Sequence, residues 1–194
     1  MVRPDYSGNG FVNLIASLVE ASGGVPRHPP LVCLPVAELR TARNLVFLIV
    51  DGLGDNYLRV NGAGGHLARH RRAAISAVFP STTASAITTS YTGATPLEHG
   101  VTGWFTYFSE AACVATALPF QRRGERTPLG VAPDRIFVER SLFDALEASS
   151  FVVSYRPIID SQYNLHHCGR AERLAYDNLE GFLEQTVSAV KSGQ

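Results

Sequence analysis

The sequence predicts an α/β protein with a mostly parallel sheet flanked by helices. Residues 46–50 form a β-branched, apolar run without alternation, which is typical of a strand buried on both faces of a parallel sheet. A second apolar segment, residues 73–79, follows after a stretch long enough for a helical crossover. A third strand is expected at residues 151–159, and helical segments separate the strands.

The composition is that of a globular protein. The chain has 194 residues, 45% of them hydrophobic and 18% charged, so we expect a single domain over residues 1–194 with residues 1–9 as a flexible lead. The net charge is zero at pH 7, which gives no reason to expect binding to nucleic acid. The longest apolar run, residues 45–50, is too short to span a membrane.

Cysteine usage and the first residues predict a cytoplasmic protein. The three cysteines are odd in number and far apart, so reduced thiols are expected rather than a disulfide framework. The N-terminal residues MVRPDYSGNG lack the apolar stretch of a secretory signal.

Helices are expected around the first two strands. Residues 10–22 place apolar side chains at helical spacing, and Gly23 ends the pattern. A short helix is expected at residues 55–60, after a glycine-rich turn. Residues 82–91 form a helix of small residues that ends near Gly93.

The second half is less regular. Residues 105–118 are expected to form a hairpin or a cap element, and residues 141–148 a helix with Ser141 as its cap. Pro157 places a bend or an edge near the end of the third strand. Residues 170–191 predict a long amphipathic helix. Because such a helix normally leads into another strand, we expect the sequence to be the first half of a larger domain, truncated before the rest.

Asp51 and Thr83 are the candidate site residues. Each follows a predicted strand, and open α/β sheets bind ligands at the carboxyl ends of their strands. A carboxylate at that position suits a divalent cation, although Asp51 alone could equally cap the next turn. A hydroxyl at a helix N-terminus suits a nucleophile beside an anion, although plain capping is the alternative for Thr83.

Three segments taken together resemble one family. VDGLGDNYL, FPSTTASAITTSYTG and TPLEHGV, within residues 44–104, are similar to the type I phosphodiesterase/nucleotide pyrophosphatase family of the alkaline phosphatase superfamily. The resemblance implies an alkaline-phosphatase-like sheet, of which this chain would hold the N-terminal half. It implies that Thr83 is the nucleophile, with Thr82 ranked second, and that Asp51 and Thr83 bind metal. It also implies two divalent ions, with zinc expected, and a small phosphoric ester as substrate.

The sequence departs from the family in two places. Nucleotide-hydrolysing members usually have Phe-Pro-Asn after the nucleophile, where this chain has Ala84-Ser85-Ala86, so nucleotide substrates are doubtful and the substrate-binding residues are unknown. The family's later ligands, an Asp-x-x-x-His and an Asp-His pair, are absent after Thr83. Asp51 and Thr83 are then the only ligands identified, and the others would have to come from elsewhere.

Three further groups of residues have open assignments. His99 is predicted to hold the loop after the nucleophile helix by hydrogen bonds, with access to the site as the alternative. His166-His167-Cys168 suggests a metal cluster, but adjacent side chains point apart, so a loop with a hydrogen-bonded histidine is favoured. The aromatic residues of the 104–108 segment could form core, which is favoured, or line a substrate pocket.

Two functions from different classes follow. The first is a metal-dependent hydrolase of phosphoric esters. The second is a catalytically inert α/β domain that serves as a binding module or fragment, for which self-association is expected because a missing half would expose a sheet edge and apolar surface. A sulfatase or phosphomutase is a third alternative, but the sulfatase pattern is absent from residues 79–86.

Overall fold

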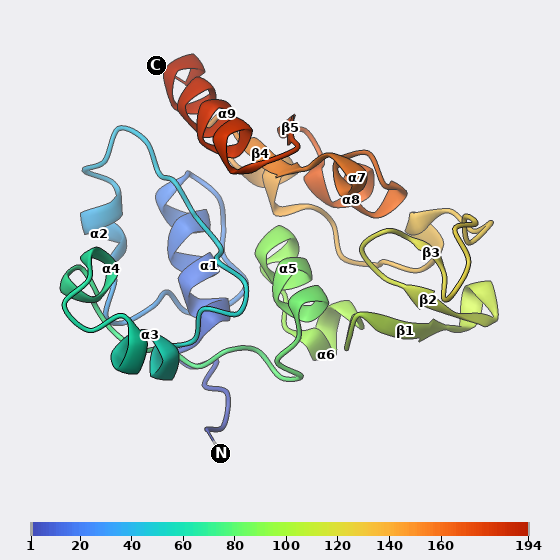
Figure 1. The fold of residues 1–194 in the computed structure, drawn as a ribbon, viewed down its shortest axis with the longest axis horizontal. Helices are drawn as coiled ribbons and strands as arrows, with labels where there is room; N and C mark the ends of the chain where they lie inside the picture. The colour runs from blue at the N-terminus through green and yellow to red at the C-terminus, as the bar shows by residue number, and fades with distance from the viewer. Residues whose placement is uncertain (1, 194) are drawn as a thin grey trace.

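A computed structural model describes residues 2–193 as a mixed α/β protein with two small sheets. Strands β1 (Phe105–Phe108), β2 (Cys113–Thr116) and β3 (Gln121–Arg122) form an antiparallel sheet, whereas β4 (Phe151–Tyr155) and β5 (Glu172–Tyr176) pair in parallel. Figure 1 shows these sheets in separate places, with the helices of the first 70 residues on the opposite side from β1–β3. The helices are α1 (Phe11–Ala21), α2 (Val36–Leu39), α3 (Asp55–Asn61), α4 (His66–Arg69), α5 (Thr83–Thr92), α6 (Pro96–His99), α7 (Arg156–Ile159), α8 (Gln162–Cys168) and α9 (Leu179–Ser192), with 3₁₀ turns at Ser109–Ala111, Pro133–Arg135 and Leu142–Ala145.

The prediction of a mostly parallel sheet is wrong for the part of the chain that the structure describes. Residues 46–50 belong to no strand, and their side chains are exposed. In residues 73–79 only Ser76 pairs, through a single parallel bridge to Gly10. A ladder requires a neighbouring strand that satisfies its N–H and C=O groups, and neither segment has one among residues 2–193. The expected βαβ unit is therefore not formed.

Helix α1 confirms the first helix predicted from the sequence. Ile15 and Val19 pack with Leu146, which joins the N-terminal part of the chain to the C-terminal part. Before α1, the Asp5 N–H donates to Ser76 Oγ at 2.8 Å, and the Gly8 carbonyl accepts from the Val32 N–H. The flexibility of residues 1–9 stays a prediction.

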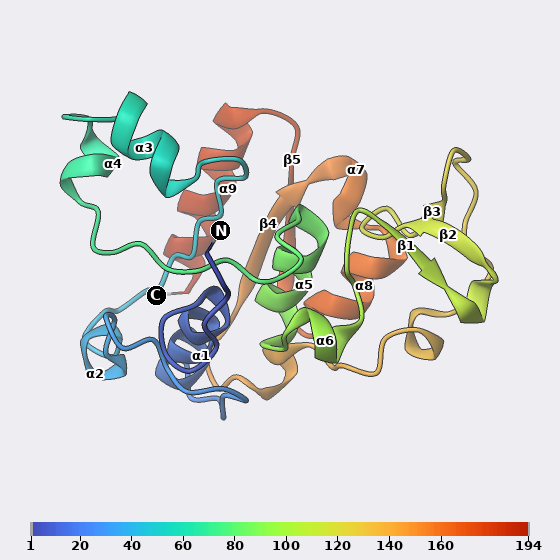
Figure 2. The ribbon, with the colours of Figure 1, turned by 90° about the horizontal axis from the view of Figure 1, so that it is seen from below.

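Helix α5 lies between α1 and α8, and its residue Ala84 belongs to the main apolar core (Figure 2). It begins and ends close to its predicted limits, and Gly93 closes it with a positive φ of 67°, a conformation that glycine adopts without strain. The core beside it is made mainly of apolar side chains from the segment before the hairpin, the hairpin, the following loop and α8, namely Val101, Phe108, Ala115, Phe120, Leu129, Phe137 and Tyr163.

Residues 105–118 contain the expected hairpin. Phe105 pairs with Thr116 and Phe108 with Cys113, so alternate side chains of β1 face the core. Phe108 is buried there, whereas Phe105 and Tyr107 are exposed. The aromatic segment thus contributes one residue to the core and leaves the others at the surface.

Three predictions for the C-terminal part need correction. The helix expected over residues 170–191 divides into β5 and α9, because residues 172–176 pair with β4 and the Asn178 side chain then caps a new helix by accepting from the Gly181 N–H. The third strand stops at Tyr155, and Pro157 lies in the first turn of α7, where its missing N–H costs nothing. Ser141 is a cap as expected, but it opens a short 3₁₀ turn.

Candidate functional site

Asp51 and Thr83 lie in direct contact. Thr83 Oγ1 donates a hydrogen bond of 2.9 Å to Asp51 Oδ2, across 32 positions of sequence. The contact brings together the two side chains that the sequence singled out. Their catalytic and metal-binding roles stay predictions.

Asp51 is held by a turn rather than by a strand end. Gly52 adopts a positive φ of 78°, and the Val50 carbonyl accepts from the Leu53 N–H at 3.3 Å. Helix α3 follows, with Asp55 in its first turn paired to Arg71. Asp51 itself is exposed, and no cationic side chain among residues 2–193 forms an ion pair with it.

Thr83 is the first residue of α5. The preceding residue, Thr82, is the N-cap and accepts from the Ser85 N–H through its side chain. The backbone N–H groups of Thr83 and Ala84 donate to no other group within the described residues. A helix of ten residues thus presents free donors and the positive end of its dipole beside the Thr83 hydroxyl, which favours an anion at that point.

A layer of buried hydroxyl contacts holds α5 in place beneath Thr83. Ser85 Oγ donates to the Val101 carbonyl at 2.9 Å, and Thr88 Oγ1 lies 2.7 Å from the Tyr163 hydroxyl. Burial raises the pKa of Tyr163 well above its ordinary value, so its hydroxyl stays protonated and can donate. The sequence analysis did not identify these contacts, although the repeated hydroxyls of residues 81–92 on one short helix were a visible sign of them.

His99 is a structural residue, as the sequence analysis favoured. Its Nδ1 accepts from the Val101 N–H at 3.1 Å, so the ring proton is on Nε2, which lies 3.2 Å from Thr89 Oγ1. Burial lowers the pKa of His99 to about 4, which keeps the ring neutral near pH 7. These contacts fix helix α6 to α5. Within the described residues, the His99 ring forms no hydrogen bond with Asp51 or Thr83.

His166 and His167 do not form a metal cluster. Both lie on α8, but His166 Nδ1 faces Asp134 at 3.1 Å, whereas His167 Nδ1 donates to the Tyr163 carbonyl at 2.8 Å. Their rings are nearly perpendicular, at 76°. Burial lowers the pKa of His167 to about 3. No group of three or more His, Cys, Asp or Glu side chains that could hold an ion exists within residues 2–193.

The residues of the site do not fit a two-metal centre by themselves. The oxygens of Asp51 and Thr83 are suitable donors for a divalent ion, but zinc alone takes about four ligands. The described residues add no third donor. The expected pair of ions therefore cannot be assigned to this chain from the side chains that the structure brings together.

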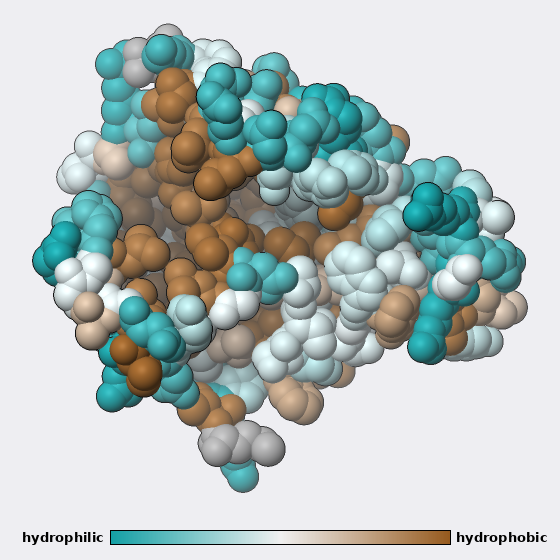
Figure 3. Space-filling model, in the orientation of Figure 1, coloured by the Kyte–Doolittle hydropathy of each residue, from teal (hydrophilic) through white to brown (hydrophobic). Residues whose placement is uncertain are grey.

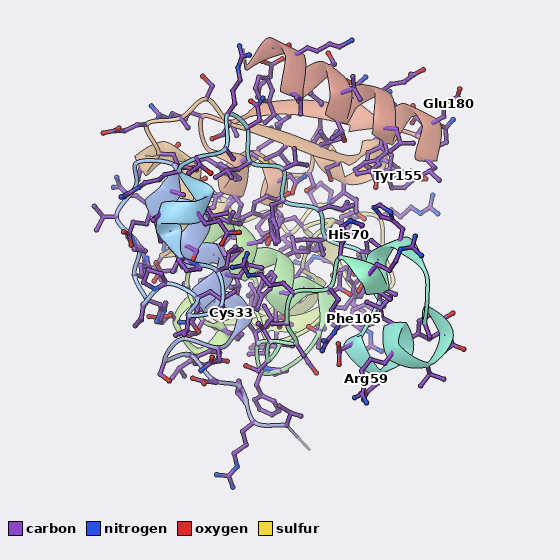
Figure 4. The ribbon with its side chains drawn as sticks, turned by 90° about the vertical axis from the view of Figure 1, so that its left-hand side faces the viewer. Cys33, Arg59, His70, Phe105, Tyr155 and Glu180 are labelled. Atoms are coloured by element: carbon purple, nitrogen blue, oxygen red, sulfur yellow. The ribbon has the colours of Figure 1, made fainter. Side chains whose placement is uncertain are left out.

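The environment of the site is open. Ala84 and Ser85 are buried, and the Ser85 hydroxyl is used within the protein, so this position offers no side chain to a phosphate oxygen. Two surface hollows of about 560 and 450 Å³ are lined by other residues, near the end of α1 and beside the start of α9. Phe105 is exposed. Figure 4 shows Glu180 of α9 well separated from Arg59 of α3.

The mixed α/β fold, with a hydroxyl at a helix N-terminus hydrogen-bonded to a carboxylate, is an arrangement suited to hydrolases that use a hydroxyl nucleophile. The chain belongs to the type I phosphodiesterase/nucleotide pyrophosphatase family, whose model matches residues 45–155. The match covers both Asp51 and Thr83. No curated protein and no solved structure matches the chain. No helix in the described part of the chain combines the length and the apolar character needed to cross a membrane.

Proposed function

We propose that this protein is a metal-dependent hydrolase of small phosphoric esters in which Thr83 is the nucleophile. The observation that carries the proposal is the hydrogen bond from Thr83 Oγ1 to Asp51 Oδ2, within the residues matched by the family. Asp51 and Thr83 are the ligands that this chain would contribute to a centre of two divalent ions, with zinc expected. A cytoplasmic location remains part of the proposal.

The chain's own groups support an in-line attack on phosphorus. A bond forms between Thr83 Oγ1 and phosphorus while the bond from phosphorus to the leaving oxygen breaks. The hydroxyl proton passes to the Asp51 carboxylate, which already accepts its hydrogen bond. The free N–H groups of Thr83 and Ala84 are close to where negative charge develops on the phosphoryl oxygens. Water then attacks phosphorus, the bond from phosphorus to Thr83 Oγ1 breaks, and the proton held by Asp51 returns to that oxygen, which releases phosphate or its ester and restores the hydroxyl.

The test is hydrolysis of a nitrophenyl phosphodiester by Thr83→Ala and by its matched control Thr82→Ala. Thr83→Ala removes the nucleophile and is expected to lower kcat by roughly 10³-fold or more. Thr82→Ala removes only the helix cap, so turnover by the folded protein should persist. Equal activity of Thr83→Ala and the unsubstituted chain would show that the proposed nucleophile is wrong, and loss confined to Thr82→Ala would move the role to that residue.

An inert domain is the second candidate, and the shortage of metal donors around Asp51 favours it. Elemental analysis of the purified chain, with turnover measured on the same sample after zinc addition, separates the two. Near-stoichiometric metal with turnover would support the hydrolase. A folded, soluble sample with neither metal nor turnover would support a binding module in which Thr83 contacts Asp51 without reacting.

A further inference from the structure

Residues 5–13 hold the chain that leads into α5. The Ser76 N–H donates to the Asn9 carbonyl at 3.1 Å, and the Ser76 carbonyl accepts from the Phe11 N–H at 2.9 Å. Ser76 Oγ accepts from the Asp5 N–H at 2.8 Å. Figure 1 shows the N-terminal segment passing the chain that runs from α4 to α5. We call residues 5–13 the N-terminal clamp, because they hold this part of the chain from more than one side.

Tyr6 makes the clamp contact that lies nearest to Thr83 in the chain. The Phe79 N–H donates to the Tyr6 hydroxyl at 3.1 Å, across 73 positions of sequence. After Phe79, the Thr82 N–H donates to the Pro80 carbonyl at 3.0 Å, and Thr83 then begins α5. The Tyr6 hydroxyl thus holds the start of the short turn that places Thr83.

Packing contributes little at this turn. Val78 is 2% exposed, but Phe79 is 68% exposed and Ser81 is exposed as well. Figure 3 shows that the molecule is hollowed on the face it draws, with apolar side chains lining the recess beneath α9. Within the described residues, the only hydrogen bond that joins residues 79–81 to another part of the chain is the one to Tyr6. The position of this turn therefore depends on the Tyr6 hydroxyl.

The backbone of Tyr6 is anchored to α1 through Asn13. The Asn13 side chain is fully buried, and its Nδ2 donates to the Tyr6 carbonyl at 2.8 Å and to the Pro29 carbonyl at 2.7 Å. Its Oδ1 accepts from the Gly10 N–H at 3.0 Å. A buried amide with both donors and its acceptor in use rigidifies the segments that it joins. The Tyr6 hydroxyl is thus presented from a fixed point.

We propose that Tyr6 is a positioning residue for Thr83, because its hydroxyl accepts the Phe79 N–H and so sets the turn from which the Thr83 hydroxyl attacks phosphorus. The inference rests on the proposed function, since it concerns the reaction of Thr83. Ser85 and Thr88 hold α5 on the side that follows Thr83, and Tyr6 holds the side that precedes it. A displacement of a reacting atom by about 1 Å can cost roughly 100-fold in rate, so the loss of either hold slows the attack.

The test compares Tyr6→Phe with Tyr155→Phe in the hydrolysis of a nitrophenyl phosphodiester. Tyr6→Phe removes the acceptor of the Phe79 N–H and keeps the ring, so kcat should fall about tenfold while KM stays within about twofold. Tyr155→Phe is the matched control, because it removes the hydroxyl of a tyrosine on β4 that is 45% exposed, and kcat should stay unchanged. A merely structural role of Tyr6 would instead shift the midpoint of urea unfolding and leave kcat of the folded protein unchanged.

The Thr83 methyl signal in nuclear magnetic resonance spectra gives a measurement that needs no turnover. Tyr6→Phe should shift this signal and speed amide exchange at Phe79, whereas Tyr155→Phe should change neither. If the unsubstituted chain is inactive, or Thr83→Ala is fully active, the proposed function fails, and the methyl signal alone then decides whether Tyr6 positions Thr83. An unmoved Thr83 methyl signal in Tyr6→Phe, an unchanged kcat for Tyr6→Phe in an active chain, or an equal fall in kcat for both variants would each overturn the proposal.

Discussion

Residues 78–104 and residues 45–61 lie within the same family match but are held in opposite ways. The first region contains α5 and α6, and its side chains pack against the hairpin and α8 or form buried hydrogen bonds. The second region contains the turn at Asp51 and α3, and it has no buried residue at all. The contact between Thr83 and Asp51 thus joins a fixed hydroxyl to a carboxylate on an uncovered segment. If Thr83 and Asp51 act as proposed, hydrolysis depends on how firmly the second region is held.

The difference in packing between the two regions is tested by making the same substitution in both. Phe137 is 4% exposed and lies against Phe108, Phe120 and Tyr163 in the core that supports α5, whereas Phe47 is 38% exposed. Phe137→Ala should lower the free energy of unfolding by about 3–5 kcal/mol, because it leaves a cavity. Phe47→Ala should lower the free energy of unfolding by about 1 kcal/mol or less.

Urea unfolding of both variants, followed by circular dichroism, measures the two costs. Equal losses in the free energy of unfolding for Phe137→Ala and Phe47→Ala would mean that the second region is as well packed as the first.

The same contrast explains which elements could be predicted from sequence. Helices α1 and α5 satisfy their own backbone, and the hairpin of β1 and β2 finds its partner a few residues away, so local pattern was enough. Residues 46–50 have an apolar pattern that is just as strong. A strand also requires a neighbouring strand to pair with, and the apolar pattern does not show whether one is present. Pairing with β4 likewise prevailed over the helical spacing of residues 172–176.

The candidate site was predictable only in part. Asp51 and Thr83 were identified through the family resemblance, and their contact does not require a sheet, because a turn and a helix N-terminus position them. The buried contacts under α5 were not predictable, since Thr88 and Tyr163 are 75 positions apart and meet only through packing. The sequence also gave no further metal donors, and the described residues add none.

A change of pH tests the buried histidines that hold the first region. Burial lowers the pKa values of His99 and His167 to about 4 and about 3 in the folded protein. In the unfolded chain both histidines have the ordinary pKa of 6.5. Between these values the unfolded chain takes up protons while the folded protein keeps both rings neutral. Stability is therefore complete above pH 6.5 and falls as the pH drops toward 4. Each ring should contribute a loss of about 2 kcal/mol between pH 7 and pH 5.

Urea unfolding at a series of pH values checks this slope. His99→Asn offers an oxygen to the Val101 N–H in place of Nδ1 and cannot titrate, so its stability should fall less steeply with pH. His66→Asn, on the exposed helix α4, serves as the control and should leave the slope unchanged. If stability fell equally steeply with pH in the unsubstituted chain, His99→Asn and His66→Asn, His99 would be excluded as the titrating group.

The smallest expected difference concerns how the two helices of the site begin. Helix α5 has a side-chain cap at Thr82, whereas α3 begins at Gly54 with none. Thr82→Ala removes an acceptor of the Ser85 N–H and should lower stability by about 1 kcal/mol. Gly54→Ser adds a cap where a side chain has free space, and it should stabilise α3 by only a few tenths of a kcal/mol. Thermal unfolding of the two variants measures both effects. Capping contributes most to stability where the capped helix is coupled to the core. If Gly54→Ser raised stability by more than Thr82→Ala lowered it, the start of α3, and not that of α5, would limit the stability of the site.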